Sequence, residues 1–123
     1  DVDMDIYAPC ALGASVNDYT LSRLNCEIIA GAANNQLADE VKHGQMLMDM
    51  GIIYAPDFLI NAGGLISVYS EIKGYDQKET LEKTKEIYNT TLDILRKSEL
   101  EGITSHEAAK QIAQTRIEQS LSN

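Results

Sequence analysis

The sequence lacks tryptophan and has a single phenylalanine, so aromatic residues make up only 6% of its 123 residues. Because 44% of the residues are still hydrophobic, we expect an aliphatic core within one domain or part of one. Basic residues are scarce too: ten Lys and Arg stand against 19 Asp and Glu, for a formal net charge of -9. Phosphate backbones are bound by clusters of Lys and Arg, so this composition argues against nucleic acid as a partner.

Long apolar runs and metal-ligand patterns are also missing. No apolar run reaches the length of about 18 residues that a spanning helix needs, so we expect no membrane partner. The two cysteines, Cys10 and Cys26, show no Cys/His spacing typical of a metal site, so no metal is predicted. We interpret them as reduced core thiols of a cytoplasmic protein, with a disulfide or a reactive thiol as the alternatives.

Three short apolar segments alternate with two amphipathic ones in the first half of the chain. The expected strands are residues 5–8, 27–30 and 52–55, and the expected helices between them are residues 15–24 and 37–50. This βαβαβ order predicts a parallel sheet of α/β class. Ligands bind beyond the carboxyl ends of strands in such sheets, so the small and amide-bearing residues that follow each strand are expected to line one cleft.

A fourth apolar run, residues 57–60, leads into Asn61 and the glycine pair Gly63 and Gly64. We interpret this run as a buried extended segment that ends in a backbone corner and opens a helix at 64–73. Paired glycines allow unusual backbone angles and let a ligand approach the main chain closely.

The remainder of the chain predicts helices. Residues 78–97 form a long amphipathic pattern, and Thr104 with Glu107 form a capping-box pattern at the start of a last helix. We therefore divide the chain into residues 1–74, half of a dinucleotide-binding domain, and residues 75–123, helices that pack on the body of the protein or on a partner subunit. A complete dinucleotide fold carries G-x-G-x-x-G after its first strand, and this sequence has none, so the expected fold is the second half of a Rossmann-type sheet followed by C-terminal helices.

Three motifs in this order resemble the Glu/Leu/Phe/Val amino-acid dehydrogenase family, and above all its leucine dehydrogenases. The matching segments are residues 9–13 (PCALG), 31–37 (GAANNQL), and 54–57 (YAPD) through 61–64 (NAGG). Any one of these segments is a weak signal, but three in order at matching spacing are a strong one, and the resemblance as a whole extends over nearly the entire chain.

The resemblance implies reversible, NAD-dependent oxidative deamination of an L-amino acid to a 2-oxo acid. It also implies a homo-oligomer and an N-terminal domain that holds the substrate. The family's catalytic lysine and aspartate and its glycine fingerprint have no match in this chain. The expectation is therefore that the chain holds no catalytic residue and does not turn over substrate alone.

By resemblance, the cofactor-binding residues lie at the ends of the predicted strands. They are Cys10, Ala11, Leu12, Ala33, Asn34 and Asn61. A side-chain amide both donates and accepts hydrogen bonds, which suits the carboxamide of nicotinamide. From the residues alone, Asn34 and Asn35 could instead cap the following helix, and Asn61 could form an ordinary turn.

The expected substrate-binding residues, also by resemblance, are Asn35, Leu65 and Val68. Leu65 and Val68 lie one helical turn apart and would form an apolar wall, where glutamate-preferring members carry a serine at the position of Val68. Burying an unpaired substrate carboxylate there would be unfavourable, so leucine, isoleucine and valine are expected over glutamate. Simple core packing is the alternative, and a helix phase shifted by one residue would place Ser67 at the pocket.

Two other functions remain open on the sequence. A non-catalytic binding or assembly module could keep this α/β core and use its helical tail as an interface. A flavodoxin-like regulatory domain is less compatible with the chain, because the predicted strand ends carry Asn, Ala and Gly rather than an acidic cluster.

Overall fold

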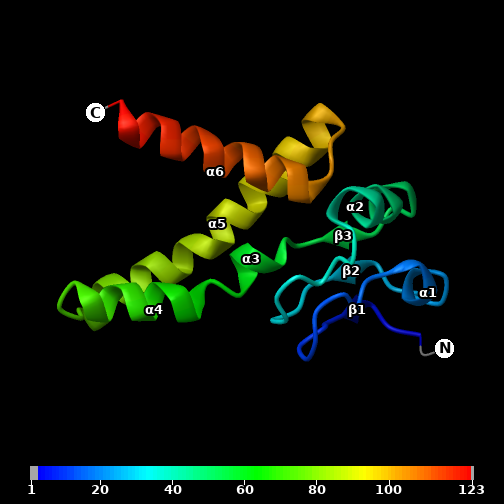
Figure 1. Ribbon diagram of the computed structural model, residues 1–123, viewed down its shortest axis with the longest axis horizontal. Coiled ribbons are helices and arrows are strands. Elements are labelled where there is room, and N and C mark those ends of the chain that lie inside the picture. Colours follow the sequence, from blue (N-terminus) through cyan, green and yellow to red (C-terminus); the bar gives the residue numbers. More distant parts are fainter. Residues whose placement is uncertain (1–2, 123) are drawn as a thin grey trace.

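The computed structural model describes residues 3–122, with a small parallel sheet at one end and helices that extend away from it (Figure 1). The strands β1 (Ile6–Tyr7), β2 (Ile28–Ile29) and β3 (Ile53–Tyr54) pair in the order β1-β2-β3, and both pairs are parallel. Helices α1 (Asp18–Leu21) and α2 (Glu40–Asp49) connect them. The predicted α/β class and its βαβαβ order are confirmed.

Four helices follow the sheet: α3 (Asp57–Ile60), α4 (Gly63–Ile72), α5 (Gln77–Glu101) and α6 (Ser105–Leu121). The prediction of an extended segment at residues 57–60 is wrong, because these residues form the helical turn α3. Pro56 (φ -54°) precedes the turn, its carbonyl accepts hydrogen bonds from the amides of Leu59 and Ile60, and Asn61 ends it. A four-residue apolar run does not distinguish a strand from a buried helical turn.

Gly63 and Gly64 begin α4 with helical backbone, so the unusual angles predicted for this pair do not occur. Among residues 3–122, positive φ at glycine is found where helices end, as at Gly51 (+71°) and Gly102 (+64°). A Cβ atom built on Gly63 or Gly64 meets nothing within 4 Å. The pair therefore leaves open space beside the backbone, as a ligand-facing segment requires.

Side chains cap the helix N-termini where the sequence offers Asn, Asp or Thr. Asn17 accepts from the amides of Tyr19 and Thr20 at 3.0 Å, and the Thr20 hydroxyl in turn accepts from the Asn17 amide. Thr104 accepts from the Glu107 amide at 3.2 Å, which is one half of the predicted capping box. The Glu107 carboxylate accepts instead from Gln111 at 3.1 Å.

Two buried clusters hold the structure together. The first lies between the sheet and α2 and consists of Val16, Leu21, Ile29, Leu37, Leu47, Ile52 and Tyr54. The second joins α5 to α6 and consists of Ile94, Ala108 and Ala109. Both are aliphatic apart from Tyr54, as the composition predicted.

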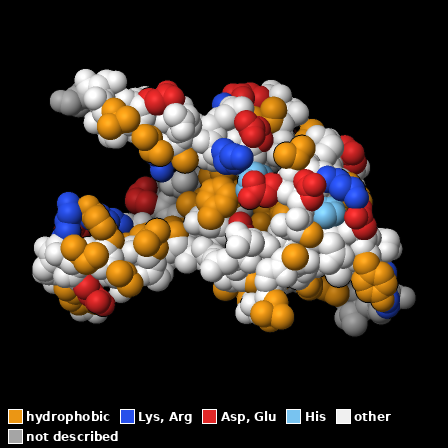
Figure 2. Space-filling view, viewed as in Figure 1, with side chains coloured by type: hydrophobic (Ala, Val, Ile, Leu, Met, Phe, Trp, Pro, Cys, Tyr) orange, Lys and Arg blue, Asp and Glu red, His pale blue; other side chains and the backbone are white. Residues whose placement is uncertain are grey.

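The helices farthest from the sheet bury little of their apolar surface. α4 has no buried residue, Leu121 near the end of α6 is 81% exposed, and Figure 2 shows hydrophobic side chains spread over this part of the surface. The division at residue 74 stays a prediction, and so does the docking of these helices on other parts of the protein or on a partner. Within residues 3–122, no helix is both long enough and apolar enough to cross a membrane.

Candidate functional site

The loops that follow β1 and β2 lie against one another at the carboxyl ends of the strands. The Ala33 amide donates to the Pro9 carbonyl at 2.9 Å, and the Ala32 amide lies 3.5 Å from Cys10 Sγ. A Cβ atom on Gly31 would lie 2.2 Å from the Pro9 carbonyl oxygen, so only glycine fits this crossing. Cys10 is exposed here, which corrects its assignment to the core, whereas Cys26 is partly buried and both thiols are free.

Asn34 and Asn61, both predicted to bind the cofactor, are in direct contact. Asn61 Nδ2 donates to Asn34 Oδ1 at 2.5 Å and approaches the Ala32 carbonyl at 3.4 Å. Asn34 Nδ2 and Asn61 Oδ1 make no hydrogen bond to other residues among 3–122. The pair therefore offers the NH2 group of Asn34 as a donor and the side-chain oxygen of Asn61 as an acceptor to a ligand.

Asn35 follows in left-handed backbone, with φ of +51°. Its carbonyl accepts from the Ala14 amide at 2.7 Å, which ties this residue to the loop after β1. The N-cap of α2 is Asp39, whose carboxylate accepts from the Lys42 amide at 2.9 Å. Helix capping, the alternative for Asn34 and Asn35, is therefore wrong, and the Asn35 side chain and the NH2 group of Asn34 remain available to a ligand.

The other predicted site residues lie on several elements. Ala33 is buried beside Gln36, while Ala11 and Leu12 are exposed on the loop after β1. Leu65 and Val68 lie on α4, are 73% and 55% exposed, and do not line the pocket that contains Asn34 and Asn35. Most of the predicted cofactor-binding residues thus lie together in the loops that follow β1 and β2. The two apolar residues predicted to bind substrate, Leu65 and Val68, lie apart from them on α4.

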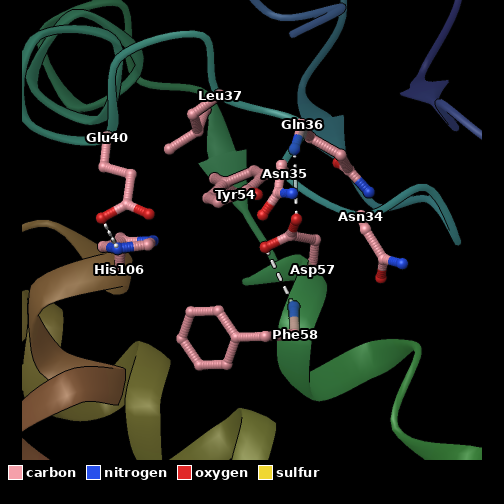
Figure 3. Close-up of a pocket in the computed structure, with 9 residues that line it drawn as sticks. All are labelled: Asn34, Asn35, Gln36, Leu37, Glu40, Tyr54, Asp57, Phe58 and His106. Carbon is pink, nitrogen blue, oxygen red and sulfur yellow. Dashed lines mark hydrogen bonds and ion pairs between the residues drawn. The ribbon is translucent and has the colours of Figure 1, made fainter. Parts of the chain in front are cut away.

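A pocket of about 210 Å³ opens beside Asn34 and Asn35 (Figure 3). Its other lining residues, which the sequence did not single out as site residues, are Gln36, Leu37, Glu40, Tyr54, Asp57, Phe58 and His106. They come from the loop before α2 and from α2, β3, α3 and α6. Gln36, Leu37, Tyr54 and Asp57 lie within the family motifs, whereas Glu40, Phe58 and His106 lie in none, and only the packing of these segments brings the residues together.

Asp57 fixes the inner wall of this pocket. Its two carboxylate oxygens accept from the Gln36 amide at 3.1 Å and the Phe58 amide at 2.9 Å. Gln36 in turn donates to the carbonyls of Gly31 at 2.7 Å and Ala33 at 2.9 Å. This chain of bonds links the start of α3 to the loop after β2. It thereby positions the asparagine corner, which is formed by Asn34, Asn35 and Asn61.

Three residues that line the pocket carry a buried polar atom without a partner: Gln36 Oε1, the Tyr54 hydroxyl and His106 Nδ1. Tyr54 is 4% exposed and its hydroxyl makes no hydrogen bond, while burial and the neighbouring Asp57 carboxylate raise the pKa of this phenol. His106 is 8% exposed; its Nε2 lies 2.9 Å from Glu40 Oε2, and its Nδ1 has no partner. The imidazole ring and the Phe58 ring pack in a T-shaped arrangement, with their centroids 5.4 Å apart. Among residues 3–122, no group of three or more His, Cys, Asp or Glu side chains could hold a metal ion.

A parallel sheet whose carboxyl ends carry amides and small residues, followed by an open glycine pair at the start of α4, defines an α/β ligand-binding fold. The sequence profile of the Glutamate/Leucine/Phenylalanine/Valine dehydrogenase family matches residues 1–123. The chain belongs to this family.

The chain is similar to two kinds of amino-acid dehydrogenase at equal identity. It is 49% identical over 118 residues to a leucine dehydrogenase of Thermoactinomyces intermedius, covering 96% of this chain and 32% of that protein. It is 49% identical over 119 residues to an L-tryptophan dehydrogenase of Nostoc punctiforme, covering 97% of this chain and 34% of that protein. The chain thus spans about a third of the length of these relatives.

Solved structures of such enzymes share the fold. A crystal structure of L-tryptophan dehydrogenase from Nostoc punctiforme superposes with a TM-score of 0.94 at 48% identity, covering 99% of this chain and 36% of that chain. Glutamate dehydrogenase from Peptoniphilus asaccharolyticus superposes at 0.73 with 24% identity over 94% of this chain and 30% of that one, which shows the fold alone.

Proposed function

We propose that the protein carrying this chain is an NAD-dependent L-amino-acid dehydrogenase that interconverts leucine, valine or isoleucine with the corresponding 2-oxo acid and ammonia. Family membership supports the general reaction. The single structural observation that carries the proposal is the Asn34–Asn61 pair, because it presents a donor and an acceptor side by side at the carboxyl ends of the strands.

This pair fits the group that the reaction requires. A nicotinamide carboxamide has one carbonyl acceptor and one NH2 donor, which complement Asn34 Nδ2 and Asn61 Oδ1. The open space beside Gly63 and Gly64 leaves room for a flat ring against the backbone. When bound, the dinucleotide supplies the hydride chemistry. The chain's own part is to orient the ring and to hold Asn35 next to it, which is catalysis by positioning.

The rest of the chemistry is assigned to other parts of the protein. We propose that a lysine and an aspartate outside this chain carry the proton transfers, and that the remaining two thirds of the protein close the cleft over Asn35. A homo-oligomer in the cytoplasm is part of the same proposal, as is Leu65 with Val68 as the wall for the substrate side chain.

L-Tryptophan is the second candidate substrate, because an L-tryptophan dehydrogenase matches the chain at the same identity as a leucine dehydrogenase. An aliphatic wall formed by Leu65 and Val68 disfavours the glutamate carboxylate, whereas it accepts either a branched-chain side chain or the largely apolar indole of tryptophan.

The test is the reduction of NAD+ by the intact protein, followed at 340 nm with L-leucine, L-valine, L-isoleucine, L-tryptophan and L-glutamate in parallel. NADP+ replaces NAD+ in a second series. We expect the highest kcat/KM with NAD+ and a branched-chain amino acid. Comparable turnover of glutamate and leucine would contradict the proposed wall. If no amino acid supports the reduction of NAD+ or NADP+, the alternative of a non-catalytic binding or assembly module is favoured instead.

A further inference from the structure

The pocket beside Asn34 and Asn35 combines a buried carboxylate from α3 with unpartnered polar atoms from β3 and α6. The Asp57 carboxylate stands on one side of the space, and the His106 ring stands on the opposite side (Figure 3). Tyr54, from β3, contributes a hydroxyl that is buried and unpartnered. A buried polar atom without a partner is unfavourable, so the pocket is built to be occupied by something that bonds to it.

The polar atoms that face this pocket are mostly acceptors. A carboxylate only accepts, so the 2.9 Å contact to Glu40 places a hydrogen on Nε2 of His106, and in that tautomer Nδ1 is an acceptor. Each Asp57 oxygen uses one lone pair on a backbone amide and keeps another. The Tyr54 hydroxyl accepts or donates. An occupant that carries several N–H donors therefore matches this set.

The charge of the pocket also favours an occupant that is a cation. Asp57 is 6% exposed and the structure gives it no cationic partner among residues 3–122, so its negative charge is neutralised only by amide dipoles. At the mouth, Lys110 lies 3.9 Å from Glu40 and offsets that second carboxylate. The rings of Phe58 and Tyr54 add faces that attract cations.

We propose that this pocket binds a primary ammonium group, either as free ammonium or at the end of a short aliphatic amine. Asp57 supplies the counter-charge, Tyr54 and His106 accept N–H bonds, and Leu37 with Phe58 pack against an aliphatic stem when one is present. Water would offer two donors and no charge, whereas an ammonium group offers at least three donors and a positive charge. The binding chemistry is independent of the proposed dehydrogenase reaction; the role of the site, next to a reaction that releases ammonia, rests on that proposed function.

The test measures thermal stability of the intact protein without coenzyme or amino acid, at pH 7.5 and fixed ionic strength. The probes are the chlorides of ammonium, potassium, tetramethylammonium and n-propylammonium. Potassium matches ammonium in size but has no N–H, and tetramethylammonium has the charge without donors. Ammonium and propylammonium are compared at one common concentration. Where that concentration is about ten times the dissociation constant, we expect Tm to rise by about 2–4 °C over potassium. A larger shift with propylammonium assigns the site to an aliphatic amine, and an equal or smaller one assigns it to free ammonium.

Tyr54→Phe is the diagnostic variant, because it removes one unpartnered hydroxyl and leaves the ring that packs in the core. We expect it to fold and to lose at least half of the ammonium shift. The matched control is Tyr88→Phe on α5, where the residue is 69% exposed and the shift should stay at its full size. The proposal would be overturned if ammonium and potassium gave the same Tm in the unmodified protein. It would also be overturned if Tyr54→Phe retained the full ammonium-induced rise in Tm. Because the readout is Tm, these outcomes are separate from whether the protein reduces NAD+.

Discussion

Asn61 Nδ2 donates a hydrogen bond to Asn34 Oδ1 at 2.5 Å, although 27 positions separate the two residues in the sequence. The bond joins the end of α3 to the loop after β2. It also fixes the orientation of both amides, since Asn34 Oδ1 is occupied and its NH2 group is turned outward. The contact therefore determines which hydrogen-bonding groups a ligand meets.

Removing this contact should weaken coenzyme binding with little effect on folding. We expect Asn61→Ala to raise the dissociation constant for NADH about tenfold, the equivalent of one hydrogen bond of about 1.4 kcal/mol. Fluorescence titration of the intact protein with NADH measures the change. Asn89→Ala on α5 is the matched control, since that residue bonds only to Glu86 on its own helix. An unchanged dissociation constant in Asn61→Ala would remove Asn61 from the proposed cofactor site.

The crossing of the loops at Gly31 and Pro9 should tolerate no side chain. Gly31→Ala places a Cβ 2.2 Å from the Pro9 carbonyl oxygen, so we expect the unfolding free energy to fall by about 1–3 kcal/mol through overpacking. Denaturant unfolding measures this loss.

Gly64→Ala is the comparison, because its Cβ meets nothing within 4 Å and alanine favours a helix. It should raise stability by about 0.5–1 kcal/mol while weakening NADH binding. If Gly64→Ala binds NADH normally, the open space beside Gly64 does not receive the coenzyme.

Val68 is expected to decide between aliphatic and acidic substrates. We expect Val68→Ser to lower kcat/KM for L-leucine about 10-fold or more, since losing methyl contacts in an apolar pocket costs about 1–3 kcal/mol. Steady-state kinetics with L-leucine and L-glutamate measure the ratio. Ser67→Ala on the same turn of α4 tests the helix phase. If the Ser67 variant changes the ratio and the Val68 variant does not, the substrate wall is displaced by one residue.

Tyr54 should make stability fall in alkaline solution. Burial and the Asp57 carboxylate raise the pKa of this phenol in the folded protein above the value of 10.0 expected when unfolded. Above pH 10 the unfolded chain loses a proton that the folded protein keeps, so the contribution is fully present below pH 10 and decreases as the pH rises. At pH 11 the loss amounts to about 1.4 kcal/mol.

Denaturant unfolding at pH 9 and pH 11 measures this difference. Tyr54→Phe should show a smaller decrease between the two values, whereas Tyr88→Phe, at an exposed position, should behave like the unmodified protein. Equal decreases in all three proteins would mean that Tyr54 ionises as readily when folded as when unfolded.

Local sequence patterns predicted the repeating part of the fold, because each pattern acts within one element. The strands at Ile6, Ile28 and Ile53 follow from short apolar segments, and the cap at Thr104 follows from its capping residue. The run at 57–60 was assigned wrongly, although Pro56 followed by Asp57 is a combination that favours a helix start.

The pocket could not be predicted in the same way. Tyr54, Asp57 and His106 meet only after β3, α3 and α6 have packed together, and each residue has an ordinary role in its own segment. The asparagine corner was found because a family resemblance named it, and the contact between Asn34 and Asn61 emerges only in three dimensions.

The two separate buried clusters imply that the chain does not open as a single unit. Between the sheet cluster and the α5–α6 cluster, the polar links include the Ser105 hydroxyl on the Tyr54 carbonyl at 2.7 Å and the His106–Glu40 contact. Amide protons in α4, which buries no residue, should therefore exchange with solvent first, those around Ile94 later, and those around Ile29 last. The contact between Asn34 and Asn61 would thus stay intact through openings that have already released the helix bearing Leu65 and Val68.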